Sequence, residues 1–433
     1  MTEATNLDGR DFDGRDFDGI DFFRARELYQ DPYPYYEYVR AHGPVWREPH
    51  RGVVMVTGYD EAISVFTDPA TFSSCNTVGG PFARFPVPLD GDDIGEIIEQ
   101  YRDTLPFSDQ LPSFDPPRHT AHRGLLMRLI TPKRLRENEE FMWRLADRHI
   151  DEFLSSGRCE FVHDYANAFT LLVIADLLGV PEEDHATFRE QLQGEQRPVN
   201  SPIQHKPLGF LYDRFTEYIE DRRRAPRHDV MTQLATATFP DGTLPDVHDV
   251  MLIAANLFAA GQETTARMLS TAMRWIGERP ELQQRLRDDR ELVPNLVEEV
   301  VRLESPIQST FRLARRAAKV GDVEIAPGTT LMLLTGAANR DPRQFDAPDE
   351  LRLDRPNGRQ HVGFGFGIHA CAGAPLARAE GRVSLERLLD RMADIRVSEA
   401  EHGPPGDRHY AYTPIYMLRG LEQLHLEFTP VAS

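Results

Sequence analysis

The chain has 433 residues, of which 40% are hydrophobic and 27% are charged, a balance typical of a globular protein with a large buried core. Its formal net charge of -20 excludes general binding to nucleic acids or anionic membranes, because either partner requires a broad positive face. Three cysteines are too few for a disulfide framework or a four-thiolate metal site, and no apolar run is long enough to span a bilayer. We expect a cytoplasmic protein.

The N-terminus repeats the unit DGRDF. Its carboxylates and glycines are compatible with calcium binding, but their spacing matches neither an EF-hand nor a nonapeptide repeat. We therefore predict a solvated, disordered tail over residues 1–20. No linker rich in Ser, Gly or Pro divides the remainder, so residues 21–433 are predicted to form a single domain.

From about residue 31, helical patterns alternate with short β-like runs such as GVVMVTGY and TTLMLLTG, and helical patterns dominate beyond residue 120. This distribution predicts a mainly α fold with small β-sheets. Residues 76–114 show little sustained structure apart from one short helical piece. A loop this long in a compact domain is usually functional.

The longest helix is predicted to begin near Asp246 and to continue for roughly 30 residues, about 45 Å at 1.5 Å per residue. It is apolar on nearly every side between Met251 and Ala260, which predicts a buried position. The polar segment AGQETT, which contains Glu263 and Thr264, lies in this buried middle. Burial of such groups costs free energy unless they are hydrogen-bonded or used. A kinked core helix with satisfied polar groups and a functional site are both compatible with this segment alone.

The segment PNLVEEVVRLESP predicts another helix, which places Glu299 and Arg302 on one face. An E-x-x-R pattern is common by chance, and a surface ion pair is the simplest interpretation of the pair by itself. Further along, residues 339–367 are dense in Asp, Pro and Arg. They predict an irregular segment that leads into the loop FGFGIHACAG.

The loop FGFGIHACAG surrounds one cysteine, Cys371, with three glycines and runs directly into a long predicted helix. It satisfies the pattern F-x-x-G-x-x-x-C-x-G, with Phe364, Gly367, Cys371 and Gly373 at the specified positions. With the segments described above in the same order, this pattern resembles the cytochrome P450 family of thiolate-ligated haem monooxygenases. The resemblance follows the soluble bacterial branch and covers residues 21–430.

The resemblance implies a mainly α fold in which haem b, iron protoporphyrin IX, lies between the long central helix and the cysteine loop, with Cys371 as the iron ligand. A thiolate ligand must be protected from protonation and oxidation. The glycines would let backbone N–H groups approach the sulfur, and the following helix would add the positive end of its dipole. Phe364 would pack over the ligand and limit access of water.

The same resemblance implies roles for two further segments. Glu263 and Thr264 match an acid-alcohol pair that handles dioxygen, in which the hydroxyl hydrogen-bonds the oxygen and the carboxylate resupplies protons from solvent. Gly261 would leave room for bound O2. Glu299 and Arg302 would form a buried structural triad with an arginine of the irregular segment. That arginine is best placed at Arg355, although the aromatic residue usual near it is not clearly present.

Haem carries two propionates, which require cationic or hydrogen-bond donor partners. The resemblance assigns this role to His119 and Arg123 on an early helix, to Arg312 in STFRLARRA, and to His369 in the cysteine loop. From the residues alone, Arg312 is equally compatible with an ordinary strand position and His119 with a surface position.

Substrate contacts are expected from the family at mostly apolar positions in four parts of the chain. These positions are Phe82, Phe85, Leu257, Ala260, Gly261, Ile307, Thr310 and Ile415. They imply a hydrophobic small-molecule substrate that is held mainly by shape. Terpenoids, steroids, fatty acids and aromatic compounds all remain open at this point.

We expect electrons to arrive from separate proteins, a ferredoxin and a ferredoxin reductase, because the chain carries no flavin or iron–sulfur module. An acidic ferredoxin requires a basic docking surface despite the net negative charge of the chain. The segment RHTAHRGLLMRLITPKRLR has no acidic residue. Within it, Arg128, Lys133 and Arg134 are expected to be free for docking.

Three other functions are compatible with parts of this pattern. A non-catalytic haem-thiolate sensor would have no need of the proton-delivery segment AGQETT, and peroxide-driven hydroxylases of this fold commonly lack the acid-alcohol pair. A cysteine hydrolase requires a histidine base near Cys371, where His369 already has another expected role. An O2-dependent monooxygenase is the favoured function.

Overall fold

The computed structural model describes residues 10–11, 15–193 and 206–431. The chain forms two compact units, each assembled from separate stretches of sequence. The first unit comprises Met1–His119, Val301–Cys371 and Tyr412–Arg419, and the second comprises Thr120–Val300, Ala372–Ala411 and Gly420–Ser433. The single domain that we expect over residues 21–433 stays a prediction.

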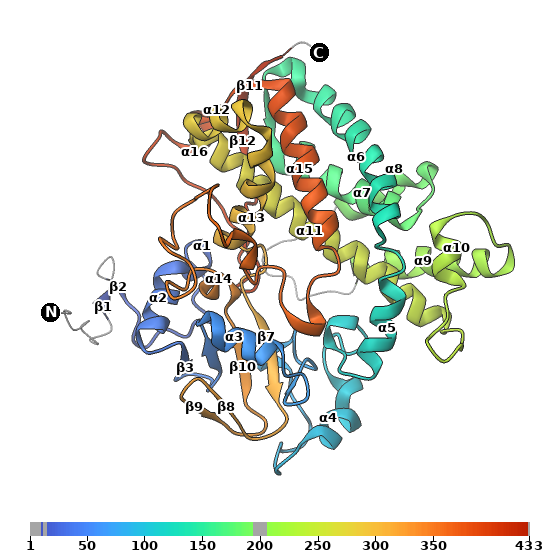
Figure 1. Ribbon diagram of the computed structural model, residues 1–433, viewed down its shortest axis with the longest axis vertical. Coiled ribbons are helices and arrows are strands. Elements are labelled where there is room, and N and C mark those ends of the chain that lie inside the picture. The colour runs from blue at the N-terminus through green and yellow to red at the C-terminus, as the bar shows by residue number, and fades with distance from the viewer. Residues whose placement is uncertain (1–9, 12–14, 194–205, 432–433) are drawn as a thin grey trace. The chain divides into compact units, whose positions relative to one another are not determined.

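The first unit contains a five-stranded sheet with the strand order β3-β4-β10-β7-β5, of which β3, β7 and β10 are labelled in Figure 1. Strands β4 and β10 are parallel, and the other neighbouring pairs are antiparallel. The strands are β3 Val45–Arg47, β4 Val54–Val56, β5 Phe72–Ser73, β7 Thr310–Ala314 and β10 Thr330–Leu333. The runs GVVMVTGY and TTLMLLTG form β4 and β10, as predicted, and their Val, Met and Leu side chains within the strands are buried.

The other elements of the first unit are short. Its helices are α1 Glu27–Gln30, α2 Tyr33–Ala41, α3 Tyr59–Phe66, α4 Gly95–Tyr101 and α14 Thr335–Ala338. Its two-stranded sheets pair β1 Arg10–Asp11 with β2 Arg15–Asp16, and β8 Ala318–Val320 with β9 Val323–Ile325. Its 3-10 turns are η1 Gly80–Phe82, η2 Arg102–Thr104, η3 Leu111–Ser113, η8 Gly358–Gln360 and η9 Gly367–His369. In residues 76–114, all of which are described, α4 is the one α-helix, in agreement with the sequence pattern.

Phenylalanines of the N-terminal repeat enter an aromatic core of the first unit. Phe22 stacks on Tyr35 with 5.0 Å between ring centroids, and Phe17 meets Tyr35 edge-on at 5.7 Å. Phe17 is only 2% exposed, so the folded part of the chain begins before residue 21. This corrects the boundary of the predicted disordered tail, most of which lies outside the described residues.

The second unit is mainly helical and is organised around α11, Val247–Glu278. This helix packs against α7 Asn167–Leu178, α9 Lys206–Arg224 and α15 Ala374–Arg391 (Figure 1). Asp246 is its N-cap, as predicted, and the helix is continuous over 32 residues. Its apolar middle is largely buried, although Ala260 at the end of that stretch is exposed.

The remaining elements of the second unit complete a helical layer and one small sheet. Its other helices are α6 Pro132–Phe153, α8 His185–Gln193, α10 Val230–Ala235, α12 Pro280–Asp288 and α16 Glu399–His402, with short turns η4 Leu154–Ser156, η5 Val162–Ala166, η6 Glu182–Asp184 and η7 Arg290–Leu292. The sheet has the order β11-β12-β6, with β6 Arg158–Glu160, β11 Met392–Val397 and β12 His425–Pro430. Two helices, α5 Arg118–Leu126 and α13 Val293–Leu303, each contain a boundary between the units.

The predicted fold class, mainly α with small β-sheets, is confirmed. Among the described residues, none of the helices is both long enough and apolar enough to cross a bilayer.

Candidate functional site

The loop before Cys371 is held by its own backbone. The N–H of Cys371 donates to the carbonyl of Phe364 at 2.7 Å, and the N–H of Ala370 donates to the carbonyl of Gly367 at 3.1 Å. Gly367 has a φ of 68°, and a Cβ atom there would lie 2.5 Å from the carbonyl oxygen of Phe66. Because only glycine fits this conformation and this contact, the course of the loop explains the first glycine of the sequence pattern.

Cys371 differs from the other two cysteines in exposure. Cys75 and Cys159 are buried, and burial raises the pKa of Cys75 to about 12 and the pKa of Cys159 above its usual range. Cys371 is exposed, so its sulfur is the one of the three that a ligand can reach. Gly373 is the N-cap of α15, which begins at Ala374.

Three of the predicted propionate partners lie in the first unit. The rings of His119 and His369 are 4.2 Å apart between centroids, and His119 is only 2% exposed, which excludes a surface position. Arg312, on β7, is 4% exposed and donates to Thr77 Oγ1 at 3.1 Å and to the carbonyl of Phe311 at 2.6 Å.

The ion pairing and the pKa of Arg312 indicate whether the predicted propionate partners suit an anionic group. Within the described part of the chain, no carboxylate forms an ion pair with Arg312, and burial lowers its pKa to about 10. A buried cation of this kind is stabilised by an anionic ligand. The cluster therefore fits a carboxylate-bearing group such as a haem propionate.

The fourth predicted propionate partner, Arg123, is half-buried near the end of α5. It follows His119 by four positions on this helix, so the two residues belong to one helical face. Both residues therefore lie on one early helix, as the resemblance implies.

Two buried arginines hold the irregular segment that precedes the cysteine loop. Arg302 is 0% exposed and donates to the carbonyls of Asn339, Pro348 and Glu350 at 3.0, 2.6 and 3.0 Å. Arg355 is 8% exposed and also donates to the carbonyl of Glu350 at 3.0 Å. Both guanidinium groups therefore bind the same carbonyl, and together they fix the backbone of this segment.

Glu299 precedes Arg302 by three positions on α13 and is 1% exposed. Because both members are buried, the surface ion pair that the E-x-x-R pattern allows is wrong. A buried carboxylate requires partners, which supports the structural role expected for this residue.

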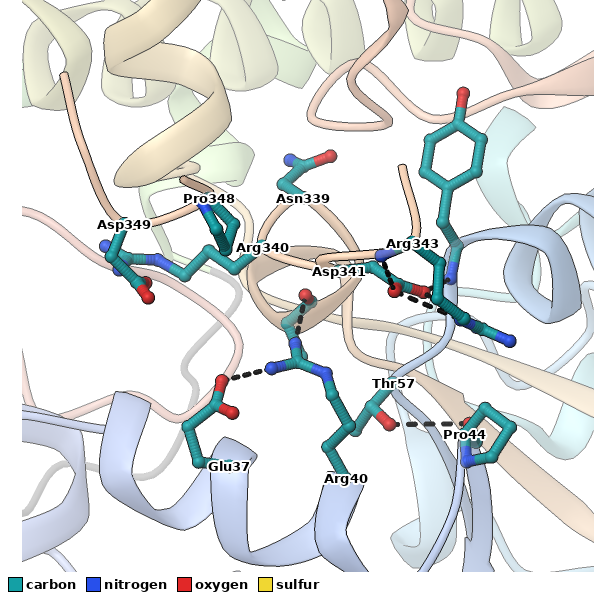
Figure 2. Close-up of polar contacts among 12 residues, drawn as sticks. Glu37, Arg40, Pro44, Thr57, Asn339, Arg340, Asp341, Arg343, Pro348 and Asp349 are labelled. Carbon is teal, nitrogen blue, oxygen red and sulfur yellow. Dashed lines mark hydrogen bonds and ion pairs between the residues drawn. The ribbon is translucent and has the colours of Figure 1, made fainter. Parts of the chain in front are cut away.

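Further contacts attach the start of the same segment to neighbouring helices (Figure 2). The carboxylate of Asp341 accepts hydrogen bonds from the backbone N–H of Tyr59 at 2.8 Å and from Arg343 at 2.7 Å. Arg40 of α2 donates to the carbonyl of Ala337 in α14 at 2.6 Å. Helices α2 and α3 are therefore bonded to the chain on either side of Asn339.

The predicted acid-alcohol pair lies on α11. The hydroxyl of Thr264 donates to the carbonyl of Ala260, one turn back, at 2.8 Å. The side chain of Glu263 is 57% exposed and forms an ion pair with Arg267, whose side chain is 8% exposed. A solvent-accessible carboxylate beside a hydroxyl is the arrangement that proton supply from solvent requires.

Gly261 has a different role from the expected one. A Cβ atom at this position would lie 3.3 Å from Cδ1 of Ile174, on α7. The open side of this glycine therefore faces α7, where it permits close helix packing. This corrects the expectation that it leaves room for bound O2.

Three of the predicted substrate positions carry large apolar side chains that are exposed. Phe82, Ile307 and Ile415 are 47%, 39% and 41% exposed. These exposures leave each of the three side chains accessible to an apolar ligand.

The other substrate positions are less uniform. Phe85 is partly buried against a small core cluster that includes Leu313. Thr310 shares a hydrogen bond of 2.8 Å with the hydroxyl of Thr77. On α11, Leu257 is 8% exposed, whereas Ala260 is exposed. Phe85 and Thr310 thus have structural contacts of their own.

In the basic segment, the side chain of Arg134 is not free for docking. The guanidinium of Arg134 donates to the carbonyls of Asp176 and Leu177 at 2.6 and 3.2 Å, at the C-terminus of α7. It therefore caps that helix, which corrects the expectation of a free side chain. Arg128 is exposed and donates to the carbonyl of Thr238 at 3.1 Å, and the Lys133 side chain is 82% exposed.

Sequence reasoning missed several buried acids, among them Asp115 and Glu380. Asp115 is 5% exposed in the first unit, and the only sequence signal for it is its place before the two prolines of DPPRH. Glu380 is 1% exposed on α15, and burial raises its pKa well above the usual range, an effect opposed by the side chain of Thr265. The sequence has no signal for Glu380, because a glutamate is unremarkable in a helix.

Comparisons with known proteins agree with this geometry. A family model described as Cytochrome P450 matches residues 203–393. Cytochrome P450 144 of Mycobacterium tuberculosis is 33% identical, and the alignment covers 98% of this chain and 95% of that protein.

Solved structures agree as well. The substrate-free cytochrome P450 CYP150A6 of Mycobacterium marinum is 54% identical, with a TM-score of 0.91 over 95% of this chain and 99% of that one. CYP109E1 of Bacillus megaterium in complex with corticosterone is 26% identical, with a TM-score of 0.78 over 93% and 100% of the two chains. The chain belongs to the cytochrome P450 family, whose members are haem b monooxygenases.

Proposed function

We propose that this protein inserts one oxygen atom of O2 into a hydrophobic small molecule, with Cys371 as the ligand of the haem iron. The observation that carries the proposal is the loop around Cys371, which presents an exposed sulfur on a backbone fixed by Gly367. Haem b, when bound, supplies the activation of O2. The residues of the chain hold this cofactor, orient the substrate and supply protons.

In this proposal, His119, Arg123, Arg312 and His369 bind the two propionates. The burial of Arg312 without a carboxylate among the described residues supports an anionic partner for this cluster. Phe364 and Gly373 belong to the loop that carries the ligand.

Glu299, Arg302 and Arg355 have a structural role in the proposal. Their burial and the carbonyl contacts of the two arginines support it, because these contacts fix the segment that enters the cysteine loop.

Thr264 is proposed to hydrogen-bond the reacting oxygen, and Glu263 to resupply its proton. The Thr264 hydroxyl has one proton and donates it to the Ala260 carbonyl at 2.8 Å, so this bond must open for the hydroxyl to donate to the reacting oxygen. The exposed carboxylate of Glu263 exchanges protons with solvent, and its ion pair with Arg267 must open for a proton to pass. Proton supply therefore depends on movement of the Glu263 side chain away from Arg267.

We propose a steroid or a similarly rigid apolar molecule as the substrate. The exposed side chains of Phe82, Ile307 and Ile415 support an apolar substrate. CYP109E1 was solved in complex with corticosterone and with testosterone, at 26% identity to this chain. Terpenoids, fatty acids and aromatic compounds are the alternative substrate classes. A spectral titration of the holoprotein with each class, which follows the loss of iron-bound water, distinguishes them.

We further propose that a ferredoxin and its reductase deliver the electrons in the cytoplasm. The exposed Arg128 and Lys133 support a basic docking surface, and the unpaired thiols of Cys75 and Cys159 are typical of a reducing compartment. Reversal of Arg128 and Lys133 to Glu should slow reduction and weaken its salt dependence. Reduction that is insensitive to salt and to both charges would place docking elsewhere.

The carbon monoxide spectrum of the reduced protein tests the ligand assignment. The purified protein should show the strongly red-shifted Soret band of thiolate ligation, and Cys371→His should abolish it. Cys159→Ala is the matched control, because it removes a buried thiol and should leave the band in place. A band that survives in the Cys371→His variant would overturn the assignment.

Turnover experiments separate the alternative functions. Product formation with NADPH, ferredoxin and reductase supports the O2-dependent monooxygenase. Product formation with hydrogen peroxide alone supports the peroxide-driven hydroxylase. A protein that binds the ligand panel but forms no product under either condition is a sensor.

A further inference from the structure

A buried carboxylate, Asp115, lies at the centre of a hydrogen-bond network in the first unit. Its Oδ1 accepts from the backbone N–H of Ser74 at 2.8 Å, and its Oδ2 accepts from the hydroxyl of Ser73 at 2.5 Å. Both serines are 0% exposed and Asp115 is 5% exposed. The carboxylate therefore fixes the backbone where β5 ends.

Arg102 supplies the counter-charge. Its guanidinium donates to Asp115 Oδ2 at 2.7 Å, to the carbonyl of Ser113 at 2.7 Å and to the more exposed carboxylate of Glu99 at 2.6 Å. Arg102 is 5% exposed. A buried carboxylate with this many donors has one fixed orientation.

The network reaches His369 through Ser74. The Ser74 hydroxyl lies 3.0 Å from Nε2 of His369, within hydrogen-bond distance. Because Asp115 holds the backbone of Ser74, the position of this hydroxyl depends on the carboxylate.

Asp115 is also connected to His119 and Arg312, two other predicted propionate partners. The backbone carbonyl of Asp115 accepts the N–H of His119 at 2.9 Å, at the start of α5. Ser73 pairs with Leu313 on β7, the neighbour of Arg312, and the charge of Asp115 raises the pKa of Arg312 against the larger effect of burial. Asp115 is thus connected to His119 through its backbone carbonyl and to Arg312 and His369 through its carboxylate.

We propose that Asp115 and Ser74 are positioning residues of the propionate-binding cluster, with Ser74 orienting the His369 ring and Asp115 fixing Ser74 and the first turn of α5. This inference rests on the propionate roles of His119 and His369 in the proposed function. It adds two residues outside the cysteine loop and outside the predicted contacts. Ser74 and Asp115 act on the cofactor indirectly, through the orientation of the His369 ring and of the first turn of α5.

The expected effect follows from what each substitution removes. Ser74→Ala removes the hydroxyl that orients His369 and leaves the backbone N–H bond to Asp115 intact. Haem transfer from the holoprotein to excess apomyoglobin should become about 5- to 10-fold faster, which corresponds to the loss of one hydrogen bond. The melting temperature of the apoprotein should fall only slightly, because the bond from the Ser74 backbone to Asp115 is kept. Propionate bending bands in the resonance Raman spectrum should shift, whereas the Soret band of the carbon monoxide complex should stay in place.

Asp115→Asn tests the carboxylate, and Glu304→Gln is its matched control. Glu304 is another buried carboxylate of the first unit, paired with Arg419 at 2.5 Å. Both variants should lower thermal stability, but only Asp115→Asn should accelerate haem transfer. Equal haem transfer rates in the two variants would overturn the positioning role of Asp115.

A third variant separates this inference from the proposed function. His369→Leu removes the proposed propionate contact itself, and it should accelerate haem transfer at least as much as Ser74→Ala. If His369→Leu accelerates transfer and Ser74→Ala does not, the positioning role of Ser74 is wrong while the propionate role stands. If neither variant changes transfer or the Raman bands, both the inference and the propionate role of His369 are wrong.

Discussion

The loop that carries Cys371 and the segment of α11 that carries Thr264 are constructed in different ways. The loop has no regular structure over most of its length, and its course depends on a glycine with a φ of 68° and on backbone hydrogen bonds such as Cys371 to Phe364. The segment before it is held by arginine side chains that bind carbonyl groups. In the segment before the loop, arginine side chains therefore fix the backbone.

On α11 the relation is reversed. The backbone is fixed by a continuous helix that packs against α7, α9 and α15, and the polar side chains project from it. A side chain on this helix can therefore change without a change in the backbone. The comparison teaches that substitutions near Cys371 should affect folding and cofactor retention, whereas substitutions at Thr264 should affect chemistry alone.

The largest effect is expected for Arg302→Ala. This change removes the guanidinium from the carbonyls of Asn339, Pro348 and Glu350, of which that of Glu350 keeps a second arginine donor, and should destabilise the first unit by roughly 3 to 5 kcal/mol. The expected product is apoprotein or aggregate, measured as the ratio of haem to protein after purification. Arg352→Ala is the control in the same segment, because Arg352 forms a more exposed ion pair with Asp346. A normal haem content in Arg302→Ala would contradict the claim that arginine side chains fix the segment before Cys371.

A smaller loss is expected for Gly367→Ala. The new Cβ would lie 2.5 Å from the carbonyl of Phe66, at a φ that alanine rarely adopts, with a cost on the order of 2 to 4 kcal/mol. Gly403→Ala makes the same kind of contact, 2.5 Å from the carbonyl of Asp407 at a φ of 82°. Both variants should melt earlier, but only Gly367→Ala should lose the thiolate Soret band. Retention of the band in both variants would mean that the cysteine loop binds haem without a glycine at position 367.

Thr264→Ala should leave haem content and melting temperature unchanged. We expect consumed electrons to appear as hydrogen peroxide, with product per NADPH reduced on the order of 100-fold, because one proton-delivery group is missing. Ser270→Ala removes the same kind of bond on the same helix, since the Ser270 hydroxyl donates to the carbonyl of Ala266 at 2.8 Å. Coupling should be normal in this control. Loss of haem in Thr264→Ala would show that the polar stretch also has a structural role.

The smallest effect is expected for Glu380→Gln. Burial raises the pKa of Glu380 in the folded state, so the carboxyl favours folding below its unfolded pKa, and this contribution is lost as pH rises through the folded pKa. The neutral glutamine should therefore raise the melting temperature at pH 8 by on the order of 2 °C and have little effect at pH 4. Glu386→Gln, at a more exposed position of α15, should shift it less. A gain at pH 4 that equals the gain at pH 8 would contradict a buried neutral carboxyl.

The sequence by itself determined the features that depend on local pattern. Apolar runs predicted β4 and β10, and the long apolar stretch after Asp246 predicted α11, because burial follows hydrophobic pattern over a short window. The spacing around Cys371 indicated the family, because the turn geometry of that loop requires glycine at one fixed place. Much of the candidate site could be located in this way.

Only the tertiary structure decided which partner each polar or small residue meets. Gly261 faces Ile174 of α7, and Arg134 caps the same helix, so neither is free as its sequence context indicated. Asp115 bonds to Ser74, which lies 41 positions earlier in the chain, and Ser74 reaches His369, 295 positions later. No pattern within a short window contains such pairs, because packing of distant segments selects them.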